Sequence, residues 1–168
     1  ALTRWLSWNS GLRHPGRPLR GADLAAAAQL GDGTAVERLL ALGLSIDARD
    51  AQGCSALLRA SGGGHLALVE NLLSRGADPG LPALTGATCL SAAVSARREA
   101  VVRCLLERGV DVGQRMPGGI TPLMVACALG APTIARVLIE HHADPLALDE
   151  HGNSALHAAA QFAFASPD

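Results

Sequence analysis

The chain has 168 residues, a formal net charge of −1 and 49% hydrophobic residues. This composition is sufficient to bury a core, and the near-neutral charge excludes the basic field by which proteins attract nucleic acid or anionic membranes. All 14 basic residues are arginine, and because arginine codons are GC-rich, we expect a bacterial source with a GC-rich genome.

The first 20 residues are interpreted as a tail or linker, rich in proline, glycine and arginine from Gly11 onward. Trp5 and Trp8 are three residues apart, which favours a short helix that packs on the domain that follows. A docking anchor for a partner is the alternative.

From residue 21 onward the sequence repeats every 33 residues. Leucine, alanine and glycine recur in this register through four or five copies. Representative columns are Leu24, Leu57, Leu90, Leu123 and Leu156; Ala27, Ala60, Ala93, Ala126 and Ala159; and Gly53, Gly86, Gly119 and Gly152. The sequence therefore predicts units at 21–49, 50–82, 83–115, 116–148 and, in part, 149–168.

Each unit has the pattern of two short helices followed by a turn. Hydroxyl residues, such as Ser55 and Thr121, precede the first apolar stripe and are predicted N-caps. Gly76 and its equivalents are predicted to end the second helix in the left-handed conformation. Gly62-Gly63-Gly64 lacks the features of a phosphate-binding loop and is predicted to be a flexible loop between two helices.

The segments 121–126 (TPLMVA) and 154–159 (SALHAA) resemble the T-P-L-H-x-A signature of ankyrin repeats. Gly76-Ala77-Asp78 and Gly64-His65 are similar to two further motifs of that family. The resemblance covers residues 21–168 and implies an all-α solenoid of stacked helix-turn-helix units with protruding β-turn or hairpin loops.

Several positions depart from the repeat. Arg97 replaces the glycine between two helices, so we expect that turn to be reshaped, and His142 replaces the glycine that ends a second helix. The fifth unit stops soon after its first helix. Continuation of the array in a longer protein is favoured over an improvised cap made by Phe162 and Phe164.

No residue pattern indicates an enzyme, a cofactor or a metal site. The four cysteines form no C-x-x-C pair, and reduced thiols in the cytoplasm are the simplest interpretation, with secretion into a host cell as the alternative. His141, His142, Asp144 and His151 lie near one turn, but neighbouring histidines at a helix end point in different directions. No apolar run approaches the roughly 18 residues of a membrane span, and no signal peptide is visible.

The resemblance implies a protein-binding module that uses a concave face of turn tips and first helices. Carried over by position, the predicted contact residues are Arg49, Gln52, Arg59, Leu84, Arg115, Met116, Ile120, Met124, Glu150 and His151. Arginine anchors beside apolar residues would suit an acidic-apolar peptide or helix, bound by a monomer, although each arginine could instead bond within its turn. The alternative function is a targeting or regulatory segment of a larger bacterial protein or host-directed effector with an enzyme domain elsewhere.

Overall fold

A computed structural model describes residues 18–165 of the chain. Within this range it contains nine α-helices, one 3-10 turn and no strand, apart from an isolated bridge between Arg49 and Ser55. The elements are α2 (Gly21–Gln29), α3 (Gly33–Ala41), α4 (Ala56–Gly63), α5 (Leu66–Ser74), α6 (Cys89–Ser95), α7 (Glu99–Glu107), η1 (Pro117–Gly119), α8 (Pro122–Ala128), α9 (Pro132–Glu140) and α10 (Ala155–Ala165). The predicted all-α repeat solenoid is confirmed. Trp5 and Trp8 lie outside the described residues.

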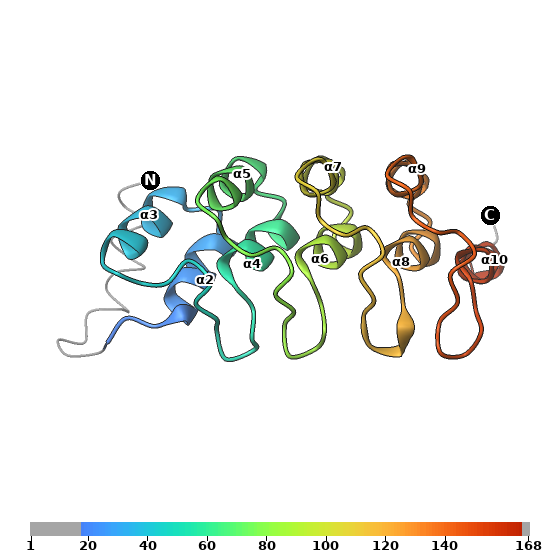
Figure 1. Cartoon of the computed structure of the whole chain (residues 1–168), viewed down its shortest axis with the longest axis horizontal. Helices are drawn as coiled ribbons and strands as arrows, with labels where there is room; N and C mark the ends of the chain where they lie inside the picture. The colour runs from blue at the N-terminus through green and yellow to red at the C-terminus, as the bar shows by residue number, and fades with distance from the viewer. Residues whose placement is uncertain (1–17, 166–168) are drawn as a thin grey trace.

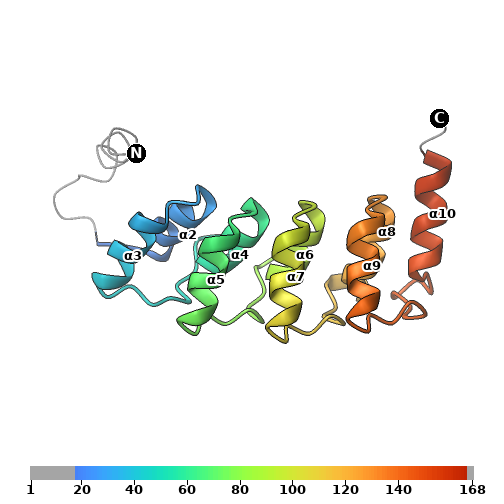
Figure 2. The same cartoon turned by 90° about the horizontal axis from the view of Figure 1, so that it is seen from above.

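The helices form two parallel rows, with loops projecting from one side (Figure 1). The inner row contains α2, α4, α6, α8 and α10, and each of these helices contacts the next one along the row. The outer row contains α3, α5, α7 and α9, and each outer helix packs against the inner helix that precedes it. Seen from above, the units succeed one another along a single axis (Figure 2).

Hydroxyl residues precede α4, α6, α8 and α10, as predicted, whereas α2 follows Arg20. The Ser55 Oγ accepts a hydrogen bond from the Leu58 N–H at 3.2 Å, and Thr121 does the same for Met124 at 3.3 Å. These bonds satisfy amides that have no partner inside the helix. In the last unit, the imidazole Nδ1 of His157 accepts a bond from the backbone N–H of Ser154 at 3.1 Å.

The repeated leucines and alanines form one continuous core. Leu24, Leu57, Leu90 and Leu123 are 0 to 1% exposed, and the alanines at 27, 60, 93 and 126 are as deeply buried. The alanine column lets adjacent inner helices approach closely, because a larger side chain would separate them. Leu156 departs from its column and is 76% exposed.

The turns at the helix ends use left-handed backbone conformations in each of the first four units. Gly43, Gly76 and Gly109 have φ values of 94°, 86° and 80°, which confirms the predicted stop of the second helix. Arg97 and His142 adopt the same conformation, with φ values of 56° and 66°. The expected reshaping at Arg97 is therefore wrong. The turn keeps its form, and a non-glycine residue bears the strain.

The glycine triplet after α4 is more ordered than its composition predicts. Gly62 and Gly63 belong to α4, and only Gly64 is left-handed. A Cβ at Gly63 would lie 2.6 Å from the ring of His65. That ring places its Nε2 2.9 Å from the Gln29 carbonyl oxygen of the preceding unit. The prediction of a flexible loop is wrong because small residues here make room for a histidine that links two units.

Candidate partner-binding face

Four hairpin-like fingers join the repeat units, and the same backbone bond closes each of them. Residues 50, 83, 116 and 149 donate their N–H groups to the carbonyl oxygens of residues 54, 87, 120 and 153, at 2.8 to 3.0 Å. The glycine before the end of each finger has a φ between 74° and 79°. The finger shape therefore depends on the backbone, which leaves the side chains at the tips free to differ between units.

In the first and last fingers, an aspartate side chain accepts hydrogen bonds from backbone N–H groups of the same finger. The Asp50 Oδ1 accepts bonds from the N–H groups of Gln52 and Cys54 at 2.8 and 2.9 Å, and the Asp149 Oδ1 accepts from His151 and Asn153 at 2.8 Å. For Asp50, partial burial opposes ionisation, but bonds from Arg59 and these amides outweigh it and lower its pKa. The pKa of Asp149 is also lowered, and the hydrogen bond from the backbone N–H of Asn153 makes the largest contribution.

Adjacent fingers are joined by backbone bonds. The Leu84 N–H donates to the Gln52 carbonyl, and the Glu150 N–H donates to the Gly118 carbonyl, each at 2.9 Å. The middle pair of fingers has no equivalent bond because Pro117 lacks an N–H group. The Pro117 ring instead packs on Gly86, where a Cβ would lie 2.3 Å from the proline Cδ. The fingertips thus form a nearly continuous edge.

Two of the three predicted arginine anchors bond within the framework. Arg59 projects from α4 and forms a 2.6 Å ion pair with Asp50, and it also donates to the Gln52 side chain at 2.5 Å. Arg115 donates to the carbonyl oxygens of Gly119 and Leu148 at 3.1 and 2.8 Å, which links the last two fingers. Among the described residues, Arg49 is exposed and its guanidinium forms no ion pair.

The predicted apolar contacts differ strongly in exposure. Leu84, at the tip of the second finger, is 78% exposed, and Ile120 is 37% exposed. Met116 is half-buried, whereas Met124 is only 5% exposed, with its sulfur 3.4 Å from the Thr121 N–H. Leu84 and Ile120 are therefore the apolar members of the predicted set that a partner can reach most readily.

A hollow of about 280 Å³ lies beside Ile120, between α8 and α10. Its walls combine apolar atoms with a few polar groups from the fourth finger. They include Ile120, Met124, Val125, Ala128, Asn153, Ala158 and Gln161. Such a depression suits a single side chain of a bound protein rather than a metabolite. We call the fingertips, this hollow and the exposed sides of the inner helices the finger face.

Glu150 and His151 form the exposed tip of the last finger. Their backbone amides are bonded to Gly118 and Asp149, and their side chains extend into solvent. Arg49 and Glu150 thus place opposite charges toward opposite ends of the finger face. Of the charged side chains between them in the predicted set, Arg59 is paired with Asp50, and Arg115 keeps its positive charge because its partners are the carbonyl oxygens of Gly119 and Leu148.

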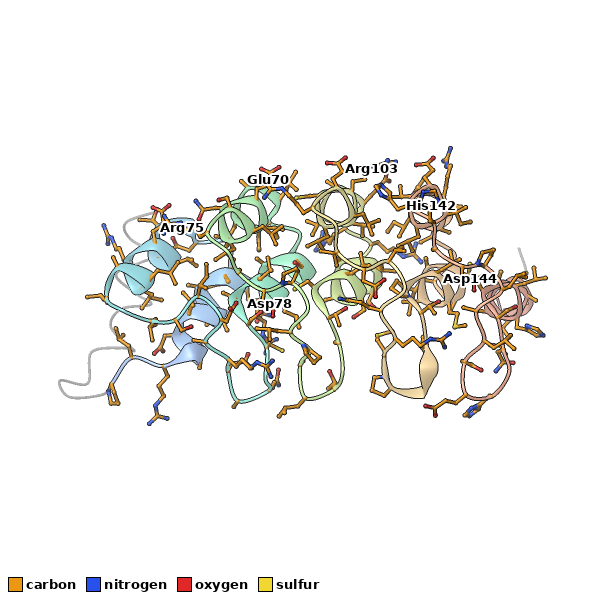
Figure 3. All side chains as sticks on the ribbon, in the orientation of Figure 1. Glu70, Arg75, Asp78, Arg103, His142 and Asp144 are labelled. Carbon is orange, nitrogen blue, oxygen red and sulfur yellow. The ribbon has the colours of Figure 1, made fainter. Side chains whose placement is uncertain are left out.

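The outer helices carry a different surface, on which charges of both signs alternate. Figure 3 shows Glu70, Arg75 and Arg103 on the side of the molecule opposite the fingers. Arg75 pairs with Glu37 at 3.5 Å, and Arg103 pairs with Glu99 at 3.0 Å and with Glu140 at 3.8 Å. Exposed pairs of this kind contribute about 0 to 1 kcal/mol each and are typical of a solvated face.

The described cysteines and histidines form no metal-binding group, and the thiols are poor nucleophiles. No group of three His, Cys, Asp or Glu residues in this part of the chain is placed to hold a metal ion. Burial raises the pKa of Cys89 to about 12, and burial also raises the pKa values of Cys54, Cys104 and Cys127. These thiols are therefore protonated and weakly nucleophilic at neutral pH.

Sequence reasoning gave bonding within the turn as the alternative for each arginine, but it did not identify Asp50 as the partner of Arg59, and it missed the hollow beside Ile120. The pairing had a signal, since Asp50 and Asp149 share one column of the repeat and both begin a finger. The hollow had none, because it depends on the packing of α8 against α10.

Comparison with known families agrees with this geometry. A family model for ankyrin repeats in three copies matches residues 24–116, and a second one, for ankyrin repeats in many copies, matches residues 105–159. The fold is a helical repeat solenoid, and the chain belongs to the ankyrin-repeat family. No curated protein matches the chain well enough to be counted as a relative. No helix in the described range is long and apolar enough to span a bilayer.

Proposed function

We propose that this chain binds a partner protein through its finger face and has no catalytic role of its own. Ankyrin repeats are generally protein-interaction modules, and the observation that carries the proposal here is the exposure of Leu84 on the second finger and of Ile120 beside the hollow. Exposed apolar groups next to a depression favour association, because their burial removes apolar surface from water.

The charges of this face indicate which part of the partner lies where. Arg49 suits an acidic group of the partner at the first finger, and the exposed Leu84 and Ile120 suit an apolar stretch in the middle. Glu150 suits a basic or neutral group at the last finger. The proposed ligand is therefore an extended segment or helix with an acidic end and an apolar middle, and the hollow receives one apolar side chain.

A matched pair of leucine variants tests the proposal. Leu84 and Leu42 are 78% and 69% exposed, but Leu42 lies at the end of α3, where the other units carry Arg75, Arg108 and His141. Both Leu84→Glu and Leu42→Glu should leave the urea midpoint nearly unchanged, because exposed substitutions shift stability by about 0.5 kcal/mol or less.

In affinity capture followed by titration of the captured protein, Leu84→Glu should weaken binding about thirtyfold, which corresponds to the loss of a contact of about 2 kcal/mol. Leu42→Glu should bind like the unchanged chain. Equal binding by all three proteins, or a loss confined to Leu42→Glu, would remove the finger face as the site.

A further inference from the structure

The acid that begins the last finger lacks the arginine that its equivalent in the first finger has. Asp50 and Asp149 are equivalent residues of the repeat, and each accepts two backbone N–H bonds through its Oδ1. The Oδ2 of Asp50 also accepts bonds from the Nε and Nη2 of Arg59, at 3.0 and 2.6 Å. The residue of α10 equivalent to Arg59 is Ala158, whose side chain has no donor.

The middle fingers show that the acid and the arginine belong together. In these two units both positions are apolar, with Ala83 and Ala92 in one unit and Met116 and Val125 in the other. The first three fingers thus combine either an acid with a base or two apolar residues. The fourth finger departs from this rule, because it keeps the acid and has lost the base.

Asp149 has no cationic partner in the described part of the chain. Its carboxylate accepts bonds from the backbone N–H groups of His151 and Asn153 and, at 3.2 Å, from the Asn153 side-chain amide, but it forms no ion pair there. The backbone bond from Asn153 contributes most to its lowered pKa, and the group is therefore ionised at neutral pH. A carboxylate oxygen can accept two bonds, so Oδ2 has room for a further donor.

A hollow lies where the missing side chain would extend. The depression of about 280 Å³ between α8 and α10 has both Asp149 and Ala158 among its walls. The walls that α8 supplies are apolar and include Met124, Val125 and Ala128. A long side chain can therefore lay an apolar stem against α8 and place a charged end at the carboxylate.

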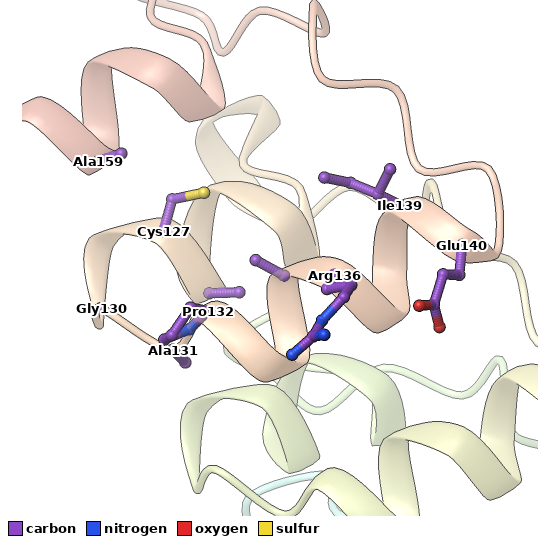
Figure 4. Close-up of a pocket in the computed structure, with 10 residues that line it drawn as sticks. Cys127, Gly130, Ala131, Pro132, Arg136, Ile139, Glu140 and Ala159 are labelled. Carbon is purple, nitrogen blue, oxygen red and sulfur yellow. The ribbon is translucent and has the colours of Figure 1, made fainter.

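A larger hollow nearby provides a contrast. It has a volume of about 500 Å³, is bounded by α8, α9 and α10, and includes Cys127, Ile139 and Glu140 among its walls (Figure 4). It shares no lining residue with the hollow at Asp149. Its acid, Glu140, already has Arg103 at 3.8 Å. This larger hollow is therefore an internal reference for cations that are attracted by charge alone.

We propose that the hollow at Asp149 binds an arginine side chain of the partner protein, which takes the place that Arg59 holds beside Asp50. The proposal rests on the proposed function, since the hollow belongs to the finger face, and it specifies the side chain that enters there as apolar along its stem and cationic at its end. A guanidinium can donate two bonds in a fixed geometry, as Arg59 does. The exposed Glu150 at the same fingertip attracts the same positive charge.

The probe is N-acetyl-L-arginine amide, added to the 15N-labelled chain and followed by NMR. With a Kd of about 10 mM, a concentration of about 20 mM should fill about two-thirds of the sites and shift the side-chain amide signals of Asn153 and Gln161, which line the hollow. The backbone signals of Cys127 and Ile139, in the larger hollow, should not move.

Two related probes test the chemistry that is recognised. N-acetyl-L-citrulline amide has nearly the same shape without the charge and should cause less than about a tenth of the shift. N-acetyl-L-lysine amide should bind at least about threefold more weakly, because an ammonium group lacks the planar fork of donors. No shift with the arginine probe, or equal shifts with either of the other two, would overturn the proposal.

Three variants locate the probe. Asp149→Asn keeps an oxygen for the amides of the finger but removes the charge, and it should raise the Kd at least about tenfold. Ala158→Arg fills the hollow from within the chain and should abolish binding. Glu150→Gln removes a charge from the same fingertip, outside the hollow, and should change the Kd by less than about threefold. Binding that survives both Asp149→Asn and Ala158→Arg would refute the site.

The captured partner separates this site from the proposed function. Ala158→Arg should weaken the binding of that partner about tenfold. If Leu84→Glu weakens the partner and Ala158→Arg does not, the finger face stands and the arginine site is wrong. If the arginine probe behaves as expected but Leu84→Glu leaves the partner bound, the arginine site stands and the proposed function fails.

Discussion

Equivalent residues end the second helix of each of the first four units in the left-handed conformation, and opposite substitutions at two of them test whether this conformation strains a non-glycine residue. Gly76 has a φ of 86°, and a Cβ added there would meet no atom within 4 Å. The cost of Gly76→Ala is therefore conformational alone. Left-handed strain of about 1 to 2 kcal/mol is partly offset by about 0.4 to 1 kcal/mol from the stiffer unfolded chain. We expect a net loss of about 0.5 to 1.5 kcal/mol.

His142 supplies the reverse change in the same column. Its φ is 66°, and its exposed side chain makes no hydrogen bond with any described residue. His142→Gly should therefore stabilise the protein by up to about 1 kcal/mol, the relief of strain exceeding the added entropy of the unfolded chain. Equilibrium urea unfolding at one fixed pH measures both changes.

Gly33→Ala is the matched control. A Cβ at Gly33 also meets no atom within 4 Å, but this glycine is the first residue of α3 and does not have a positive φ. Its replacement should be neutral or stabilising by about 0.4 to 1 kcal/mol. If Gly76→Ala behaved like Gly33→Ala, or if His142→Gly were destabilising, left-handed strain would not explain why glycine is favoured at the end of the second helix.

Three further predictions concern single contacts. Asp50→Asn should lower stability by about 1 to 2 kcal/mol at neutral pH, through the loss of charge-assisted bonds. Because the folded pKa of Asp50 lies below its unfolded value of about 3.9, this contribution is full above that pH and is lost as pH falls through the folded pKa. The free energies of unfolding of the variant and the parent, measured by urea titration across pH, should therefore converge at low pH. A difference in free energy that stayed constant with pH would contradict the assignment. Gly86→Ala should cost about 2 to 4 kcal/mol, because it combines a positive φ with a collision against Pro117, and Pro117→Ala should recover part of that loss in the double variant. Cys89 should resist iodoacetamide in the folded protein and react on denaturation, since burial raises its pKa to about 12, and rapid labelling in the native state would argue against that burial.

The sequence predicted the fold well because one physical pattern is repeated in register. Leu57, Leu90 and Leu123 all face the same core, so that each copy supports the interpretation of the others. Arg97 was harder to predict, because a residue that prefers other conformations is left-handed in a turn whose backbone bonds run from Arg97 and Arg98 to α6. The binding residues were less predictable still. Arg59 and Arg115 lie at positions where the residue differs between repeat units. Only the coordinates show that Arg59 pairs with Asp50 and that Arg115 donates to the Leu148 carbonyl oxygen.

The central claim is that a partner lies on the finger face, and amide hydrogen exchange of the chain with and without its captured partner tests it most directly. The account predicts added protection in the segments 49–54, 82–87, 115–120 and 148–153 and little change in α5 and α7. Protection concentrated on α5 and α7, with exchange in the fingers unchanged, would contradict the claim.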